Sequence, residues 1–63
     1  MSDELFDAIM VNIETSEVTI MGANKTKENA EAIENMAIMR RGVETHFYDV
    51  VPAGTYKNGD IRK

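Results

Sequence analysis

His46 is the only histidine of this 63-residue chain, and it stands two residues from both Glu44 and Tyr48 in an alternating segment. A histidine beside a carboxylate can act as a general base. Nucleophilic catalysis also needs an activated serine, cysteine, threonine or lysine within its reach. The chain has no cysteine, and its two serines, Ser2 and Ser16, stand near the N-terminus and in a predicted turn. We therefore interpret His46 as a surface residue and expect no enzymatic activity.

The same residue types give little support for a metal site. One histidine with scattered carboxylates is a weak set of ligands, and a structural zinc site would need more cysteine or histidine than the chain contains. Hydrolysis by paired carboxylates needs two acids across a cleft, and so short a chain has little depth for one. We expect neither a metal nor a cofactor.

Basic side chains stand at both ends of a predicted helix. The segment 22–27, Gly-Ala-Asn-Lys-Thr-Lys, leads from a strand into the helix, where free backbone amides can bind an anion beside Lys25 and Lys27. It lacks the glycine spacing of a phosphate-binding loop. Arg40 and Arg41 stand at the other end of the helix. These four residues are the candidates for an anion site, and ordinary helix capping is the alternative.

A small acidic scaffold must position these side chains. Seven Lys and Arg against eleven Asp and Glu give a net charge of −4. This balance argues against direct binding to nucleic acid, which needs a basic stripe. No apolar run approaches the roughly 20 residues needed to cross a membrane, and the first residues lack the basic region of a signal peptide. We expect a cytoplasmic protein that does not associate with membranes.

Alternating apolar residues predict two strands, 5–14 and 17–22, after a flexible segment at residues 1–4. A two-residue Thr-Ser turn between them would place Ile13 opposite Val18. Thr-Ser is a poor choice for such a tight turn. A longer loop with a bulge is therefore the alternative.

A helix is predicted over residues 25–41, after a strand break at Gly22-Ala23-Asn24. Asn24 or Thr26 can cap its first turn, and Gly42 suits its C-terminal cap. One broad apolar stripe should face the sheet, and it comprises Ala30, Ala32, Ile33, Met36, Ala37 and Met39. Ile38 lies outside this stripe.

The pattern in the last third of the sequence predicts a strand over 43–51, which ends at Pro52. A short hairpin or a tail is predicted to follow over 55–62. The fold class is therefore α+β. We expect a single ββαβ domain over 1–63, with a three-stranded antiparallel sheet in the order 3-1-2 and one helix on one face. This order places the most apolar strand in the middle and avoids a parallel pair in a very small sheet.

One helix can cover only one face of such a sheet. We expect it to cover the face that carries Ile9, Val11, Ile13, Val18, Ile20 and Phe47. The other face would then show Phe6, Ala8, Met10, Met21 and Tyr48. Because an apolar patch of several hundred Å² is rarely left in water, we expect a second copy of the chain to cover it. The alternatives are the C-terminal tail, using Tyr56 and Ile61, and a different protein.

The resulting functional hypothesis is a small, homo-oligomeric, non-enzymatic protein that binds and blocks another protein. Accessory proteins of phages and mobile elements that inhibit a host or defence protein are the class we expect. The predicted interface residues are Phe6, Met10, Met21 and Tyr48, with Ile38 as a second contact. An oligomer that sequesters an anionic ligand such as a nucleotide is one alternative. An acidic DNA mimic, suggested by five acids and no base in residues 1–17, and a structural assembly subunit are two others.

Overall fold

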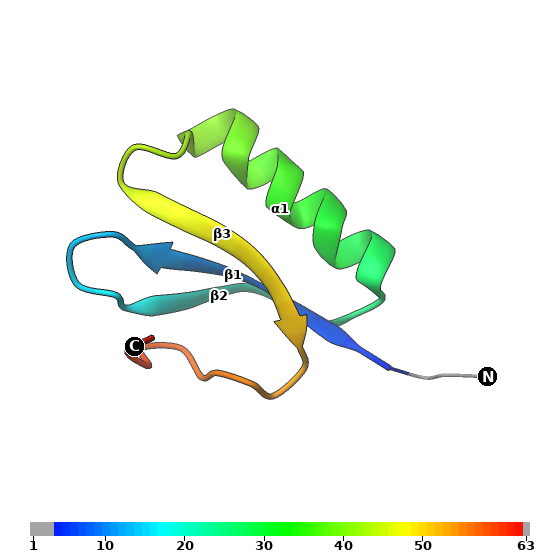
Figure 1. Cartoon of the computed structure of the whole chain (residues 1–63). Helices are drawn as coiled ribbons and strands as arrows, with labels where there is room; N and C mark the ends of the chain where they lie inside the picture. The colour runs from blue at the N-terminus through cyan, green and yellow to red at the C-terminus, as the bar shows by residue number, and fades with distance from the viewer. Residues whose placement is uncertain (1–3, 63) are drawn as a thin grey trace.

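The computed structural model describes residues 4–62 as a three-stranded sheet with a helix on one face (Figure 1). Its elements, in chain order, are β1 (Phe6–Asn12), β2 (Val18–Lys25), α1 (Lys27–Arg41) and β3 (His46–Pro52). The strands lie in the order β2-β1-β3, and both pairs are antiparallel. The predicted α+β class and the predicted strand order are confirmed.

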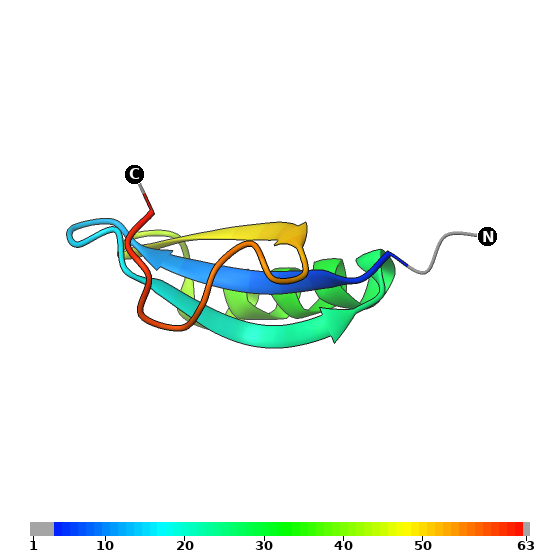
Figure 2. The same cartoon turned by 90° about the horizontal axis from the view of Figure 1, so that it is seen from below.

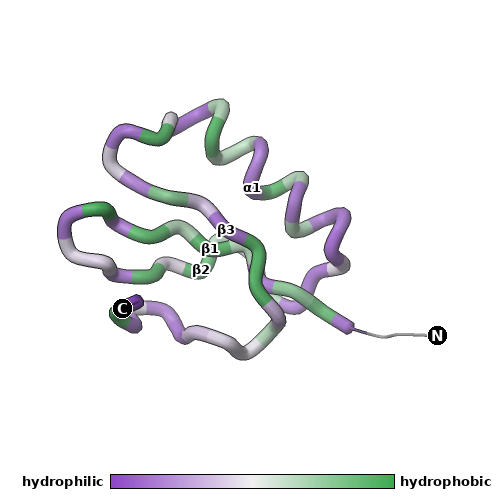
Figure 3. Tube along the Cα trace, viewed as in Figure 1, coloured by the Kyte–Doolittle hydropathy of each residue, from purple (hydrophilic) through white to green (hydrophobic). Residues whose placement is uncertain are grey.

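β1 is the central strand, and its five interior residues, 7–11, are all buried. Figure 3 shows β1 and the end of β3 largely in hydrophobic colours, whereas most of the segment after β3 is neutral or hydrophilic. An alternating strand with one face in water would show burial at every second residue. Burial at every position therefore means that β1 is covered on both faces.

The register between β1 and β2 differs from the predicted one by two residues. Val11, not Ile13, lies opposite Val18, so residues 13–17 form a five-residue loop. A shift of two residues keeps every side chain on the same face of the sheet. The predicted two-residue turn is wrong, and the longer loop is confirmed.

Asn12 stabilises this loop. Its side-chain carbonyl accepts hydrogen bonds from the backbone N–H groups of Glu14, at 2.8 Å, and Thr15, at 3.0 Å. Ser16 then adopts a positive φ of 63°, and its N–H donates to the backbone carbonyl of Asn12 at 2.7 Å. Asn side chains commonly bond to backbone two residues ahead in this way.

The predicted strand break at Gly22 is wrong, because β2 continues to Lys25. Met21 is the extra residue of a β-bulge between the pairs that Ile20 and Gly22 make with β1. A side chain on Gly22 would come within 2.6 Å of Ile33 Cδ1 on the helix. Glycine here therefore lets α1 approach the sheet closely, and does not end the strand.

α1 begins and ends as the sequence indicates. Of the two candidate caps, Thr26 is the one used: its hydroxyl accepts from the Asn29 N–H at 3.2 Å. Gly42 ends the helix with φ of 74°, and its N–H donates to the Ile38 carbonyl at 2.8 Å. Residues 43–45 form the bend that follows, so β3 begins three residues later than predicted.

The predicted apolar stripe of α1 is only partly confirmed. Ala30 and Ala37 are its buried residues. Met36 is 53% exposed and Met39 is 85% exposed, whereas Ile38, predicted to lie outside the stripe, is 37% exposed. The side of the helix that faces the sheet is thus narrower than predicted, and its methionines remain accessible.

The face of the sheet that α1 covers is the opposite of the predicted one. Met10 and Met21 line one groove with Ile33 of α1, and the Tyr48 hydroxyl donates to the carbonyl of Gly42 at 2.8 Å. The connection β2–α1–β3 joins two parallel strands by a right-handed crossover (Figure 2). That handedness is nearly universal, and it decides the face regardless of which face is more apolar.

The C-terminal segment, residues 53–62, covers the other face. Figure 2 shows it leaving the end of β3, crossing β1 and reaching β2. Beneath it lies a cluster of buried residues with two half-buried neighbours, namely Ile9, Val11, Val18 and Val51 with Ile20 and Tyr56. Ile13 and Phe47 belong to this face but remain exposed. Cover by the tail, the alternative left open by the sequence, is therefore present, but on the opposite face from the one expected.

Hydrogen bonds attach the C-terminal segment to the outer edge of β2. The Val18 N–H donates to the Asp60 carbonyl at 2.7 Å, and the Val18 carbonyl accepts from the Gly59 N–H at 2.8 Å. The Ile20 N–H donates to the side-chain carbonyl of Asn58 at 2.8 Å. The first half of this edge is thus paired by the chain itself.

The predicted hairpin over 55–62 does not form, although its Asn-Gly turn does. Gly59 has φ of 91°, and the Asp60 N–H donates to the Lys57 carbonyl at 3.0 Å. The flanks of this turn do not pair with each other. Ile61 instead forms an antiparallel bridge with Glu17, just before β2, and the Arg62 N–H donates to the Ser16 carbonyl at 2.8 Å.

Asp7, in the central strand β1, links three segments of the chain by hydrogen bonds. It is 4% exposed. Its carboxylate accepts the Asn24 N–H at 2.9 Å through Oδ1 and the Gly54 N–H at 3.1 Å through Oδ2. These donors belong to the end of β2 and to the turn after β3. A buried carboxylate needs such donors to offset its lost hydration.

No helix within residues 4–62 is long and apolar enough to cross a membrane. The segment predicted to be flexible, residues 1–4, lies outside the described residues except for Glu4.

Replacement of Asp7 should destabilise the fold strongly. Asp7→Ala removes the carboxylate that accepts the part-buried N–H groups of Asn24 and Gly54, and each lost hydrogen bond to a charged group costs about 1.5–3 kcal/mol. We expect the urea midpoint to fall by more than a third in equilibrium unfolding. Glu44→Ala, at an exposed position, is the control and should leave the midpoint unchanged. Equal midpoints for the two variants would contradict the role of Asp7.

Tyr56 should contribute to stability by covering the second face. Tyr56→Ala removes a half-buried aromatic ring from the cluster that contains Ile9 and Val51, and we expect a loss of about 1–2 kcal/mol in the free energy of unfolding. Lys57→Ala, at the exposed neighbouring position, is the matched control. A Tyr56 variant as stable as the Lys57 variant would show that the segment does not cover this face in solution.

Candidate functional site

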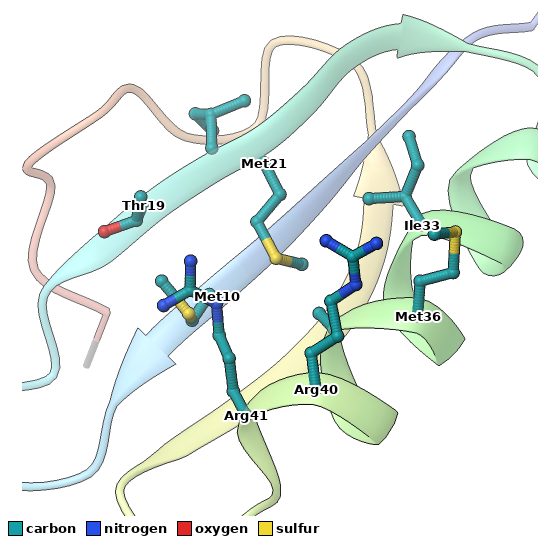
Figure 4. A pocket seen from close by; sticks show the side chains of 9 residues that line it. Met10, Thr19, Met21, Ile33, Met36, Arg40 and Arg41 are labelled. Atoms are coloured by element: carbon teal, nitrogen blue, oxygen red, sulfur yellow. The ribbon is translucent and has the colours of Figure 1, made fainter.

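A groove of about 470 Å³ opens between α1 and β2 (Figure 4). It contains four of the predicted site residues, taken from two different predicted sites. Met10 and Met21 were expected on an uncovered sheet face, and Arg40 and Arg41 in an anion site. The groove is lined by Met10, Thr19, Ile20, Met21, Ile33, Met36, Ala37, Arg40 and Arg41.

Three methionines give the groove its apolar character. Met10, from β1, is 9% exposed and lies deep, whereas Met36, from α1, is 53% exposed at the rim. Met21 points from β2 into the space between the strand and the helix (Figure 4). It does so because alternation along β2 places Met21 on the same face as Thr19, which pairs with Met10. Methionine is flexible and polarisable, so such a surface adapts to differently shaped apolar groups.

Two arginines from the last turn of α1 give the groove a positive end. The side chain of Arg40 extends towards β2, beside Met21 and Ile33, and that of Arg41 extends towards Met10 (Figure 4). Both residues are exposed. Within residues 4–62 the ion pair present joins Arg62 to Asp49, so neither of these two guanidinium groups is neutralised by a carboxylate of the described chain.

The position of the two arginines also has a structural explanation. Positive charge in the last turn of a helix interacts favourably with the helix dipole. That interaction needs the charge near the C-terminus, but does not require a side chain to extend along an apolar groove. The groove therefore combines cationic donors with apolar walls, and its lining includes no carboxylate or imidazole.

Lys25 and Lys27 are not part of this groove. Lys27 is the first residue of α1, and 13 residues of helix separate it from Arg40, a distance of about 20 Å. The four predicted anion-binding residues therefore lie at opposite ends of the helix. They do not form one site within a single chain.

Three predicted interface residues also lie elsewhere. Phe6 is half-buried where β1 pairs with Lys25 and Pro52. Tyr48 is half-buried against the end of α1 through its hydrogen bond to Gly42. Ile38 is exposed on the helix but does not line the groove.

His46 and Glu44 do not come together as a catalytic pair. The Nδ1 atom of His46 lies 2.8 Å from the Thr45 hydroxyl. Glu44 instead lines a second hollow, of about 320 Å³, beside Ile13 and Glu14 of the β1–β2 loop. No group of three His, Asp or Glu side chains able to hold a metal ion occurs within the described part of the chain.

Sequence reasoning missed the helix side of the groove, which Ile33, Met36 and Ala37 provide. Their spacing fits one face of a helix and therefore predicts a core position. Residue type is the signal that could have distinguished these groove residues from core residues. A core stripe of alanine packs closely on a sheet, but two long methionines among alanines, Met36 and Met39, extend beyond that close contact.

Comparison with known proteins gives no further indication: no protein-family model, no curated protein and no solved structure shows a significant match to the chain.

Glu34 offers a test of the electrostatics of α1. Its partial burial raises the pKa of its carboxyl group, and the carboxylates of Asp49 and Glu31 raise it further. A pKa raised in the folded state means that the protonated form stabilises the fold. This stability is fully present below the unfolded pKa and is lost as the pH rises through the folded pKa.

We therefore expect Glu34→Gln to be more stable than the wild type at about pH 7, by roughly a few tenths of a kcal/mol because the group is partly hydrated. The difference should vanish at about pH 3, where Glu34 is protonated. Urea unfolding at both pH values measures it. Glu28→Gln, in the first turn of α1, loses a favourable interaction with the helix dipole and should be slightly destabilising at about pH 7. A Glu34→Gln variant that is less stable than the wild type at that pH would contradict this account.

Proposed function

We propose that this chain is a non-enzymatic binding protein that engages another protein through the groove between α1 and β2 and thereby blocks the bound surface. The observation that carries the proposal is the combination of three methionines with the guanidinium groups of Arg40 and Arg41, which have no carboxylate partner within residues 4–62.

The residue types of the groove favour a protein partner. Methionine and arginine are both enriched in protein–protein interfaces. A methionine-rich surface can repack around its partner, and arginine adds hydrogen bonds of defined geometry. The groove is open to solvent along β2, and its side chains include no general base for chemistry. Its shape and composition thus suit the binding of an apolar side chain with an acidic neighbour.

Charge selects among possible partners. The chain as a whole is acidic, so a strongly acidic partner would be repelled at long range. Arg40 and Arg41 provide local positive charge at one end of the groove, where a carboxylate can be bound in bidentate geometry. We infer that the partner places a few acidic residues beside apolar ones, with no extended acidic surface.

An accessory inhibitor of a host or defence protein, the class expected from the sequence, acts in this manner. Self-association also stays a prediction, although the sheet face on which it was based, with Met10 and Met21, is covered by α1, and the other face by residues 53–62. Sedimentation at micromolar concentration tests it, and a monomer at every concentration would exclude it.

Reversal of charge at the groove should abolish partner binding. We expect Arg40→Glu/Arg41→Glu to lose at least tenfold in capture of a partner from a lysate of the source cells, since two charge-assisted hydrogen bonds are replaced by repulsion. Capture on the immobilised chain, followed by quantitative mass spectrometry, measures this loss.

Two controls accompany the experiment. Lys27→Glu reverses a charge at the other end of α1, and Met39→Gln changes an exposed methionine outside the groove. Both should capture the same proteins as the wild type. A set of captured proteins that is unchanged by the arginine variant, or equally reduced by the lysine variant, would contradict the proposed site.

A further inference from the structure

The two outer edges of the sheet are protected to different extents. Exposed strand edges present unpaired backbone groups, and proteins usually protect them by proline, by charge or by cover from another segment. On β3, the Val50 N–H is occupied by the Asp49 side chain at 2.8 Å, and Pro52 has no N–H to donate. The β3 edge is therefore poorly suited to pairing with another strand.

On β2, protection stops at Ile20. The C-terminal segment occupies the N–H and carbonyl of Val18 and the N–H of Ile20. Within the described residues, neither the Ile20 carbonyl nor residues 21–23 bond to that segment. Figure 2 shows the C-terminal segment reaching only the first part of β2. The stretch that follows, Met-Gly-Ala, carries neither a charge nor a proline.

This open stretch borders the groove. Met21 belongs to both, since it lies in β2 and points towards α1. Gly22 has no side chain, and Ala23 is small and exposed, so another backbone can approach closely. A strand added here would lie about 4.8 Å from β2, and its alternate side chains would point to the helix side of the sheet. Met21, Ile33 and Met36 offer apolar contacts there, and Arg40 offers a cation.

We propose that the partner presents an extended segment that adds as a strand to the β2 edge beyond Ile20 and places alternate side chains in the groove, an apolar one and an acidic one two or four residues apart. This inference rests on the proposed function and names the partner's structure. Backbone hydrogen bonds would hold the segment, and the groove would select its side chains, as in other cases of strand addition.

A second copy of the chain does not fit this edge. Residues 18–24 contain no Asp or Glu, and Lys25 follows them. Pairing of two β2 edges would therefore bring no carboxylate to the arginines. The unneutralised charge of Arg40 and Arg41 favours an acidic segment from a different protein.

Selection of a random decapeptide display library on the immobilised full chain tests the inference. We expect enriched peptides to contain an acidic residue two or four positions from an apolar one, so that both side chains face the groove, and no proline in the middle. Enrichment should disappear on the Arg40→Glu/Arg41→Glu chain and persist on the Lys27→Glu chain, whose changed residue is the first of α1. Failure to enrich any peptide, or enrichment of peptides without acids, would overturn the inference.

Backbone methylation of the best enriched peptide then separates strand addition from side-chain binding. In an added strand, alternate N–H groups face β2. N-methylation of one alternate set should weaken binding at least tenfold, the equivalent of about 1.4 kcal/mol for lost hydrogen bonds. Methylation of the other set should change it less than threefold. Equal effects of the two sets would overturn strand addition.

The two proposals fail in different ways. If lysate capture depends on the arginines while no peptide is enriched, or while both methylated peptides bind alike, the groove binds a folded surface and only the inference of an added strand is wrong. If capture is insensitive to the arginines, the proposed function itself is wrong.

Discussion

The burial of β1 on both faces is the constraint on which the rest of this small structure depends. Five consecutive buried residues in the central strand require a cover on each side, but the described chain has one helix. The second cover is the C-terminal segment, which contributes few apolar side chains and is held mainly by backbone hydrogen bonds to β2 and to Asp7. Each sheet face of so small a domain is thus covered by a different kind of element.

The same arrangement explains why a groove exists. α1 packs on the sheet through small residues, with Ala30 and Ala37 buried and Gly22 allowing close approach at Ile33. Because α1 contacts the sheet closely only at these residues, the longer methionine and arginine side chains lie beside that contact, towards the outer edge of β2. The C-terminal segment covers only the first part of that edge. The narrow contact between helix and sheet therefore leaves the groove, and the limited reach of the C-terminal segment leaves the strand edge beside it open.

Several features of the fold could be predicted from local sequence. Alternation in β1 and β3, the cap at Thr26, the positive φ at Gly42 and the end of β3 at Pro52 each follow from the conformational preferences of a few neighbouring residues. Local patterns were less informative where two segments interact. Gly22 resembles a strand break because glycine often ends strands, and only its contact with Ile33 explains why β2 continues. In the same way, the side of α1 that carries Met36 resembled core because helical spacing alone does not measure the width of the contact with the sheet.

The sequence by itself determined the element types, the strand order and the groups of residues that share a face, since these depend on periodicity and on the apolar character of β1. The tertiary structure alone decided which face the helix covers, because the right-handed crossover from β2 to β3 is a property of the connected sheet and not of either strand. It also placed Met21 and Arg40 in one groove, with Lys25 and Lys27 outside it. The lysines lie outside the groove because the two ends of a 15-residue helix are about 20 Å apart. Met21 and Arg40 share the groove because the helix folds back over the sheet, which places residues that are distant in the sequence in one site.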